Sequence, residues 1–185
     1  LIFIIILFIL AGIKLNSDSK HATTLNTLYT GKIEDVHKIL IQEGQDAIEL
    51  YKDNETWKIA GNDTLEVREN KISNFFDNVL TAGSETLVSN NSEKWDTFSV
   101  GDSTGMHLAI INTEDVTIGY YVFGRSKKDW SHNYVRYDNK PEVYLTNTSI
   151  IHHLNTRDIF WGEIPKPIEI PQDSLNSQLD TLNNI

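Results

Sequence analysis

Apolar and polar residues alternate along the first part of the chain, and this alternation predicts three consecutive β-strands. The strands are expected at residues 33–41, 48–51 and 56–59, with turns at 43–46 and 53–54 between them. Short alternating runs bounded by turn residues are typical of half-buried antiparallel strands in a meander. The apolar residues expected to face the core are Ile33, Ile39, Ile41, Ile48, Leu50, Trp57 and Ile59.

The spacing of apolar residues then changes from two to three or four, which predicts an amphipathic helix. Asp63, with Glu66 three residues later, resembles a capping box, and Gly83 is a plausible stop. We expect this helix to lie across the meander with its Phe residues in the core. Its apolar stripe has the i, i+3, i+4, i+7, i+8 spacing of one helix face and consists of Ile72, Phe75, Phe76, Val79 and Leu80.

A second group of strands is predicted in the C-terminal half. Residues 106–110 and 116–122 alternate in polarity around a turn at 112–115 and predict a hairpin, with further strands at 134–137 and 143–145. A short second helix, capped by Asn147 or Thr148, is expected to follow. Its apolar side carries Ile150, Ile151 and Leu154. The expected fold class is α+β: two antiparallel strand groups, a meander and hairpins, packed with one amphipathic helix and a short second helix.

The residues before and after these elements predict four parts in the chain. Residues 1–15 form an N-terminally truncated transmembrane or signal-anchor segment, and residues 16–30 a polar tether. Residues 31–162 form the globular α+β domain, and residues 163–185 a Pro-, Asn- and Gln-rich tail or linker. Leu1–Ile13 has no polar side chain, but as a helix it reaches only about 20 Å of the roughly 30 Å membrane core.

A retained single-pass anchor is favoured over a cleaved signal peptide, because no small-x-small cleavage site follows the apolar run. The body is then expected to be periplasmic or extracellular. The chain has 16 Lys and Arg against 26 Asp and Glu, a net charge of -10, so nucleic acid would be repelled. It has no Cys, which excludes disulfides, thiolate sites and a lipidated cysteine anchor.

One sequence string resembles a catalytic motif, but the residues around it do not supply the other groups that catalysis needs. The string Gly101–Gly105 (GDSTG) looks like the nucleophile segment of chymotrypsin-like serine proteases. A triad also needs a His base, an orienting Asp and an oxyanion hole, and the upstream candidates His21 and His37 lie in the tether and in a strand. A tight turn that enters the strand at Met106 is the favoured interpretation.

Histidines and carboxylates give no recognisable site. His152 and His153, with His132 and Asp158, suggest a metal site, but adjacent histidines on a helix diverge by about 100°, so surface histidines are favoured. A glycosidase needs two carboxylates at a fixed distance across a cleft, which the sequence does not reveal. We predict no catalytic, cofactor-binding or metal-binding residue and no cofactor, and an enzyme is the less favoured class.

Four residues of the second strand group are candidate contacts for a ligand or partner: Arg136, Tyr134, Tyr120 and Trp130. Arg136 lies between aromatic residues, where its planar fork can bind a carboxylate of a ligand or form an internal salt bridge. The salt bridge is favoured. The aromatic side chains suit an interface, although packing of a half-buried sheet explains them as well.

Several short motifs, weak individually, gain weight from their order and spacing between about Gly31 and Trp161. They are residues 47–59 with Trp57, 72–80, 87–89 with Trp95 and Phe98, 118–119, 134–136 and 143–144. In this order they resemble the bacterial family known as domain of unknown function 4340, whose members usually begin with one membrane-spanning segment. Some members are encoded near transport systems of the gliding-associated kind. The resemblance allows an accessory role at a membrane complex and assigns no activity.

Three functional hypotheses follow. The first is a membrane-anchored extracytoplasmic domain that acts in binding or scaffolding as an accessory to a membrane transport complex. Its partners would be membrane lipid, through the N-terminal segment, and protein subunits of the complex. The second is an extracytoplasmic hydrolase of glycan or peptide, which needs a pocket where ionisable groups with shifted pKa converge. The third is a passive structural module of a longer surface protein.

Overall fold

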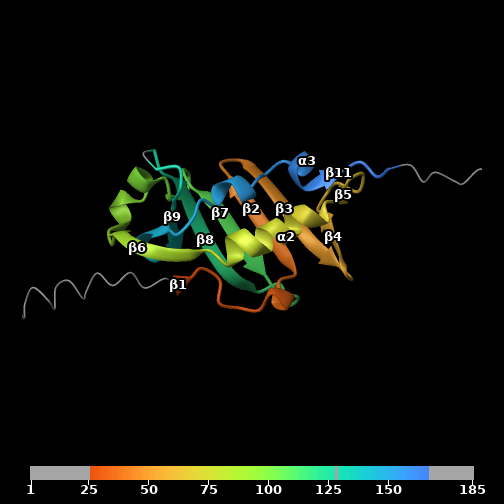
Figure 1. Cartoon of the computed structure of the whole chain (residues 1–185), viewed down its shortest axis with the longest axis horizontal. Coiled ribbons are helices and arrows are strands. Elements are labelled where there is room, and N and C mark those ends of the chain that lie inside the picture. Colours follow the sequence, from red (N-terminus) through yellow and green to blue (C-terminus); the bar gives the residue numbers. More distant parts are fainter. Residues whose placement is uncertain (1–25, 128, 167–185) are drawn as a thin grey trace, which may run out of the picture.

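The computed structural model describes residues 26–127 and 129–166 (Figure 1). The predicted membrane segment, most of the predicted tether and most of the predicted tail lie outside these residues. Within the described ranges, no helix has both the length and the apolar character needed to cross a membrane.

Nine antiparallel strands form one sheet, which is the body of the protein. They are β1 (Asn26–Thr27), β2 (Lys38–Glu43), β3 (Asp46–Asp53), β4 (Thr56–Ile59), β6 (Gly83–Ser89), β7 (Met106–Ile111), β8 (Thr117–Arg125), β9 (Asn133–Tyr137) and β10 (Val143–Thr146). The order across the sheet is β1-β6-β10-β9-β8-β7-β2-β3-β4. Most neighbours are consecutive in the chain, as hairpin connections require. The predicted meander (β2-β3-β4) and hairpin (β7-β8) are confirmed.

The two predicted strand groups are parts of this one sheet, which corrects the expectation of two groups. β2 pairs with β7 along its whole length, from Lys38 opposite Ile111 to Glu43 opposite Met106. Both strands place a row of fully buried residues on the same face. The junction between the groups is therefore as well packed as their interiors. The residues in this row are Ile39, Ile41, Leu108 and Ile110.

The predicted amphipathic helix is confirmed, and it crosses one face of the sheet (Figure 1). It consists of α2 (Glu69–Phe75) and a π-helical turn, η3 (Phe76–Leu80). The predicted capping box is wrong, because Glu66 pairs in a separate small sheet and the helix begins after Arg68 without a side-chain cap. Gly83 begins β6. The helix residues buried against the sheet are Ile72, Phe75, Val79 and Leu80.

The chain already packs into the core before Gly31, where the globular domain is expected to begin. Leu28 and Tyr29 lie in the core, although the sequence places them in the tether, and the Leu28 N–H donates to the Ala82 carbonyl oxygen at 2.7 Å. The first predicted strand begins only at β2, because Ile33–Asp35 forms a 3₁₀ turn. Ile33 is 44% exposed and does not face the core.

A smaller second layer covers the opposite face of β8, β9 and β10. Tyr121 and Phe123 belong to the main core, whereas Val122 between them belongs to a separate cluster, because successive residues of a strand point to opposite faces. Gly124 of β8 lets the segment around Phe98 lie close to the strand, since a Cβ at this position would clash with the Phe98 carbonyl oxygen. The cluster comprises Val100, Val122 and Val143, packed against Val88, Trp95, Phe98, Tyr120 and Tyr134.

The C-terminal part of the fold closes over the helix. The short predicted helix is confirmed as a 3₁₀ turn, η6 (Ile151–His153), with the predicted apolar residues Ile150, Ile151 and Leu154 buried. It has no side-chain cap. Asn147 instead accepts a hydrogen bond from the Gly83 N–H at 2.9 Å through its side chain.

A small two-stranded sheet follows, which the sequence pattern did not predict. α3 (Asp158–Trp161) leads into β11 (Gly162–Glu163), which pairs with β5 (Glu66–Val67). Trp161 is fully buried, with its ring edge-on to Phe75 at 6.2 Å between centroids. Its indole N–H donates to the Asn155 carbonyl oxygen at 2.7 Å. Trp161 therefore joins the C-terminal segment from η6 to β11, which we call the closing segment, to helix α2.

Candidate functional site

Arg136 is fully buried beneath the second layer, and its guanidinium donates hydrogen bonds to oxygen atoms of the protein. Its Nε donates to the Val100 carbonyl oxygen at 2.7 Å. Its terminal nitrogens donate to the Asp138 carbonyl oxygen and to the Asp102 carboxylate. The guanidinium also lies over the Trp95 ring, 4.0 Å from the centroid. The geometry is that of the internal salt bridge.

Of the other three predicted contact residues, Tyr120 and Tyr134 lie in the second layer near Arg136, and Trp130 lies apart from them. The Tyr134 ring is edge-on to Phe98 at 5.0 Å, and the Tyr120 hydroxyl lies 2.7 Å from His107 Nδ1. Burial raises the pKa of the Tyr120 hydroxyl, against the opposing charge of Arg136. Tyr120 and Tyr134 thus belong to the second layer with Arg136. Trp130 is 87% exposed on the β8–β9 connection.

The protease-like string is a tight turn that enters β7, as expected. The Gly105 N–H donates to the Gly101 carbonyl oxygen at 2.9 Å, and the Gly101 N–H donates to Thr104 Oγ1 at 3.2 Å. His107, the nearest histidine along β7, has its Nε2 3.0 Å from the Asp102 carbonyl oxygen. Its two ring nitrogens are therefore both engaged by the fold rather than by a serine.

The upstream histidines do not complete a triad at this turn. The His37 N–H donates to the Ile111 carbonyl oxygen at the end of β7 that is distant from the turn. The two ends of β7, Met106 and Ile111, are five residue steps apart, about 16 Å at strand spacing. His21 lies outside the described residues.

The histidine pair differs from the expectation, because its rings lie side by side. The centroids of His152 and His153 are 3.9 Å apart. The segment is a 3₁₀ turn, in which successive residues diverge at least as much as in an α-helix, so the rings lie together despite the divergence of the backbone positions. His132 contacts Asp129 instead. In the part of the chain that the structure describes, no three His, Asp or Glu side chains are arranged to hold a metal ion.

The histidine pair predicts a loss of stability in mild acid. Burial, His152 and Lys71 lower the pKa of His153 in the folded protein. The unfolded chain, with a His pKa of about 6.5, then binds a proton more readily than the folded one. The contribution of His153 to the free energy of unfolding should be constant above this pH, fall as the pH drops below it, and level off below the folded pKa. The slope is at most about 1.4 kcal/mol per pH unit.

Urea denaturation between pH 7.5 and 4.5 measures this effect. His153→Gln should remove this contribution to the slope, and Lys71→Met should reduce it, because one of the two neighbouring charges is gone. A slope unchanged by His153→Gln would show that the pair does not cause it.

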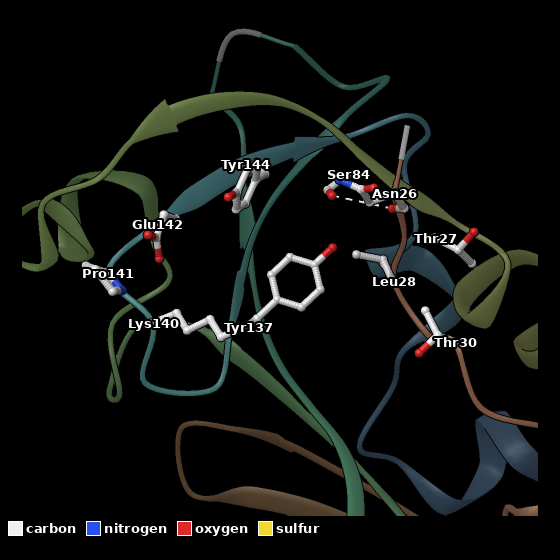
Figure 2. Close-up of a pocket in the computed structure, with 10 residues that line it drawn as sticks. All are labelled: Asn26, Thr27, Leu28, Thr30, Ser84, Tyr137, Lys140, Pro141, Glu142 and Tyr144. Atoms are coloured by element: carbon white, nitrogen blue, oxygen red, sulfur yellow. Dashed lines mark hydrogen bonds between the residues drawn. The ribbon is translucent and has the colours of Figure 1, made fainter. Parts of the chain in front are cut away.

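A candidate site is a cleft of about 600 Å³ that is lined in part by the first residues that the structure describes (Figure 2). The residues of β1 and the segment after it line one side, together with Ser84 of β6, which is paired with Asn26. Residues of β9, β10 and the β9–β10 turn line the other side. Figure 2 shows the Tyr137 ring projecting into its centre with the hydroxyl directed toward Ser84. We call it the Tyr137–Tyr144 cleft. Its lining residues are Asn26, Thr27, Leu28, Thr30, Ser84, Tyr137, Lys140, Pro141, Glu142 and Tyr144.

A chain of ring contacts fixes the shape of this cleft. Tyr137 and Tyr144 lie on neighbouring strands, edge-on at 6.0 Å between centroids, and Tyr137 also packs edge-on to Tyr121 at 5.7 Å. The Tyr121 hydroxyl donates to the Leu28 carbonyl oxygen at 2.8 Å. The backbone at Leu28 and the aromatic wall are therefore held in one arrangement, so the cleft is preformed.

The chemistry of the cleft suits recognition of a side chain. Burial raises the pKa of Tyr137, partly offset by a hydrogen bond with Ser84. Burial and the neighbouring Glu142 raise the pKa of Tyr144. Both hydroxyls therefore stay protonated at neutral pH and can donate hydrogen bonds beside two apolar ring faces. Lys140 and Glu142 add one charge of each sign.

Sequence reasoning missed this cleft, although it noted the aromatic richness of these strands. Tyr137 and Tyr144 each lie on a predicted strand, and the hairpin that joins the strands brings them together. The signal that could have found the site is this pair of tyrosines either side of a short Pro-containing turn. The opposite wall, Asn26–Thr30, gives no such signal, because its composition is that of a tether.

Comparison with known proteins identified a family and no individual relative. A family model described as domain of unknown function (DUF4340) matches residues 57–162, more than half of the chain. Neither the curated proteins nor the solved structures gave a match.

Proposed function

Because the chain belongs to the domain of unknown function 4340 family, which assigns no activity, we propose a function from the geometry: a membrane-anchored extracytoplasmic binding domain. In this proposal the Tyr137–Tyr144 cleft binds a protein subunit of a membrane transport complex, to which the domain is an accessory. The anchor is the apolar N-terminal segment, and the domain lies outside the cytoplasm.

The observation that carries the proposal is the position of the cleft at the first residues that the structure describes. Asn26, Thr27 and Leu28 form one of its walls. Residues 16–25 separate this wall from the predicted anchor, and ten residues span at most about 35 Å when fully extended. A partner in or beside the membrane is therefore within reach of the cleft, and a short tether raises its effective concentration there.

The preformed aromatic wall supports binding rather than chemistry. Aromatic side chains with polar tips are enriched at the centres of interfaces, and a rigid pair such as Tyr137 and Tyr144 loses little conformational entropy when it is covered. The charged residues of the cleft, Lys140 and Glu142, lie in the β9–β10 turn at its rim. Rim charges mainly steer association and contribute specificity.

Purification of the full chain from native membranes in mild detergent tests the proposal. We expect defined membrane-protein subunits to co-purify with it, and Tyr144→Ala to reduce their recovery by about tenfold, as for a residue at an interface centre. Tyr51→Ala is the matched control, since Tyr51 is a half-buried strand tyrosine on distant β3, and its recovery should match the wild type. A solitary protein, or equal loss in both variants, would contradict the proposal.

A further inference from the structure

We infer that the partner enters as an extended polypeptide segment that pairs with the outer edge of β6 and inserts an apolar or aromatic side chain into the Tyr137–Tyr144 cleft. The segment has a Lys or Arg beside that side chain. This inference rests on the proposed function and specifies how the same cleft recognises its partner.

The outer edge of β6 is incompletely covered. On its inner side β6 pairs with β10, from Ser89 opposite Val143 to Ser84 opposite Thr146. On its outer side, among the described residues, only β1 pairs with it, opposite Gly83 and Ser84. The backbone of residues 85–89 therefore has no neighbouring strand on that side within the described chain. Such an edge is a template for another extended chain.

The composition of this edge is suited to pairing. Residues 85–89 (ETLVS) include one charged residue and no Lys or Pro, the residues that most often block edges. The opposite edge of the sheet differs, because β4 has only four residues. Its Lys58 forms an ion pair with Asp53, and Ile59 already bridges to Asn62. The two edges are therefore not equivalent, and among the described residues the backbone that has no neighbouring strand and few blocking residues is that of β6.

The open edge and the cleft are continuous. Leu87 is 51% exposed and lies opposite Tyr144 in the sheet, so it extends the aromatic wall outward. Ser84, the last residue covered by β1, lines the cleft itself. A strand laid along residues 85–89 runs beside Leu87, with β6 between it and Tyr144 on β10. Its alternate side chains can turn toward the cleft that Ser84 lines.

The acidic charge around the open edge and the cleft favours a partner segment that contains a basic residue. Glu85 lies on the open edge, and Glu142 lies on the rim of the cleft, against one Lys140. The whole chain carries a net charge of -10. A segment with a basic residue beside its apolar one complements this surface, whereas an acidic segment is repelled.

A library of ten-residue peptides tests the inference on the full chain in detergent micelles. Thr occupies alternate positions, and Val, Phe, Tyr, Lys or Arg the others. We expect enrichment of peptides that combine an aromatic and a basic residue. N-methylation of alternate backbone amides in a selected peptide should weaken binding at least tenfold, because the pairing hydrogen bonds are lost. Binding should also slow amide exchange within residues 85–89.

Matched variants locate the site. Leu87→Lys should weaken binding at least about fivefold, because it places a charge on the open edge and removes an apolar contact. Ile159→Lys makes the same change at another exposed apolar position, 65% exposed on α3, and should leave binding within about twofold. Equal effects of the two variants would overturn the inference.

The outcomes separate this inference from the proposed function. Equal affinity for the N-methylated peptide, with binding still lost in Tyr144→Ala, would overturn strand pairing and leave the cleft as the binding site. Failure to enrich any peptide would overturn the inference. The inference would also be overturned if the amides of residues 85–89 were already protected from exchange in the free chain, because upstream residues of the chain would then pair there. Recovery of membrane subunits with the wild type, lost in Tyr144→Ala, supports the proposed function in each case.

Discussion

Arg136→Met should lower the free energy of unfolding by about 3–5 kcal/mol, one of the two largest effects expected for a single change in this protein. The substitution leaves the carbonyl oxygens of Val100 and Asp138 without their donor. An unsatisfied buried polar group costs about 1–3 kcal/mol. The change also removes the contact between the guanidinium and the Trp95 ring, worth about 0.5–2 kcal/mol.

Asp102→Asn is the control for this prediction. The Asp102 side chain is 79% exposed, although its partner Arg136 is fully buried, so solvent weakens its contribution. We expect less than about 1 kcal/mol for this change. Urea denaturation followed by Trp fluorescence measures both variants. A loss under about 1 kcal/mol for Arg136→Met, or equal losses for the two, would refute the view that Arg136 stabilises the second layer through the backbone.

Trp161→Ala should have an effect of similar size, about 3–5 kcal/mol, which is typical of a buried Trp truncation. The indole is fully buried between Phe75 and Phe160, and its N–H satisfies the Asn155 carbonyl oxygen. Its removal leaves a cavity beneath the closing segment and one unpaired carbonyl. We expect faster amide exchange in β5 and β11, because their pairing depends on this contact.

Trp130→Ala is the matched control, since Trp130 is 87% exposed. Its stability should stay within about 0.5 kcal/mol of the wild type. If Trp161→Ala were as mild as this control, the closing segment would not contribute to the core in the way described.

The sequence predicted elements whose pattern is local and missed the contacts that join distant segments. Phe75 and Val79 lie on one face of a helix whatever else the chain does, and their spacing was sufficient to predict it. The pairing of β2 with β7 has no local signature, because any two apolar strands satisfy the same alternation. Asn147 is a good helix cap by type, but its side chain bonds to Gly83 of a distant strand.

The candidate site shows the same division. The sequence offered two interpretations for Arg136, and only the fold shows that the turn after Val100 brings Asp102 to its guanidinium. The Tyr137–Tyr144 cleft requires a wall from Leu28 and its neighbours, whose polar surroundings resemble a tether. Burial of Leu28 and Tyr29 depends on a short pairing with β6, which composition cannot reveal.

The central claim is that the Tyr137–Tyr144 cleft is where the domain meets its partner, and photo-cross-linking in intact cells tests it most directly. A photoreactive amino acid replaces Lys140 at the rim of the cleft or, as the control, Asn54 in the β3–β4 turn at the opposite edge of the sheet. The account predicts one dominant membrane-protein adduct from position 140, lost when Tyr144→Ala is added, and none from position 54. The same adducts from both positions, or no adduct from position 140, would contradict it.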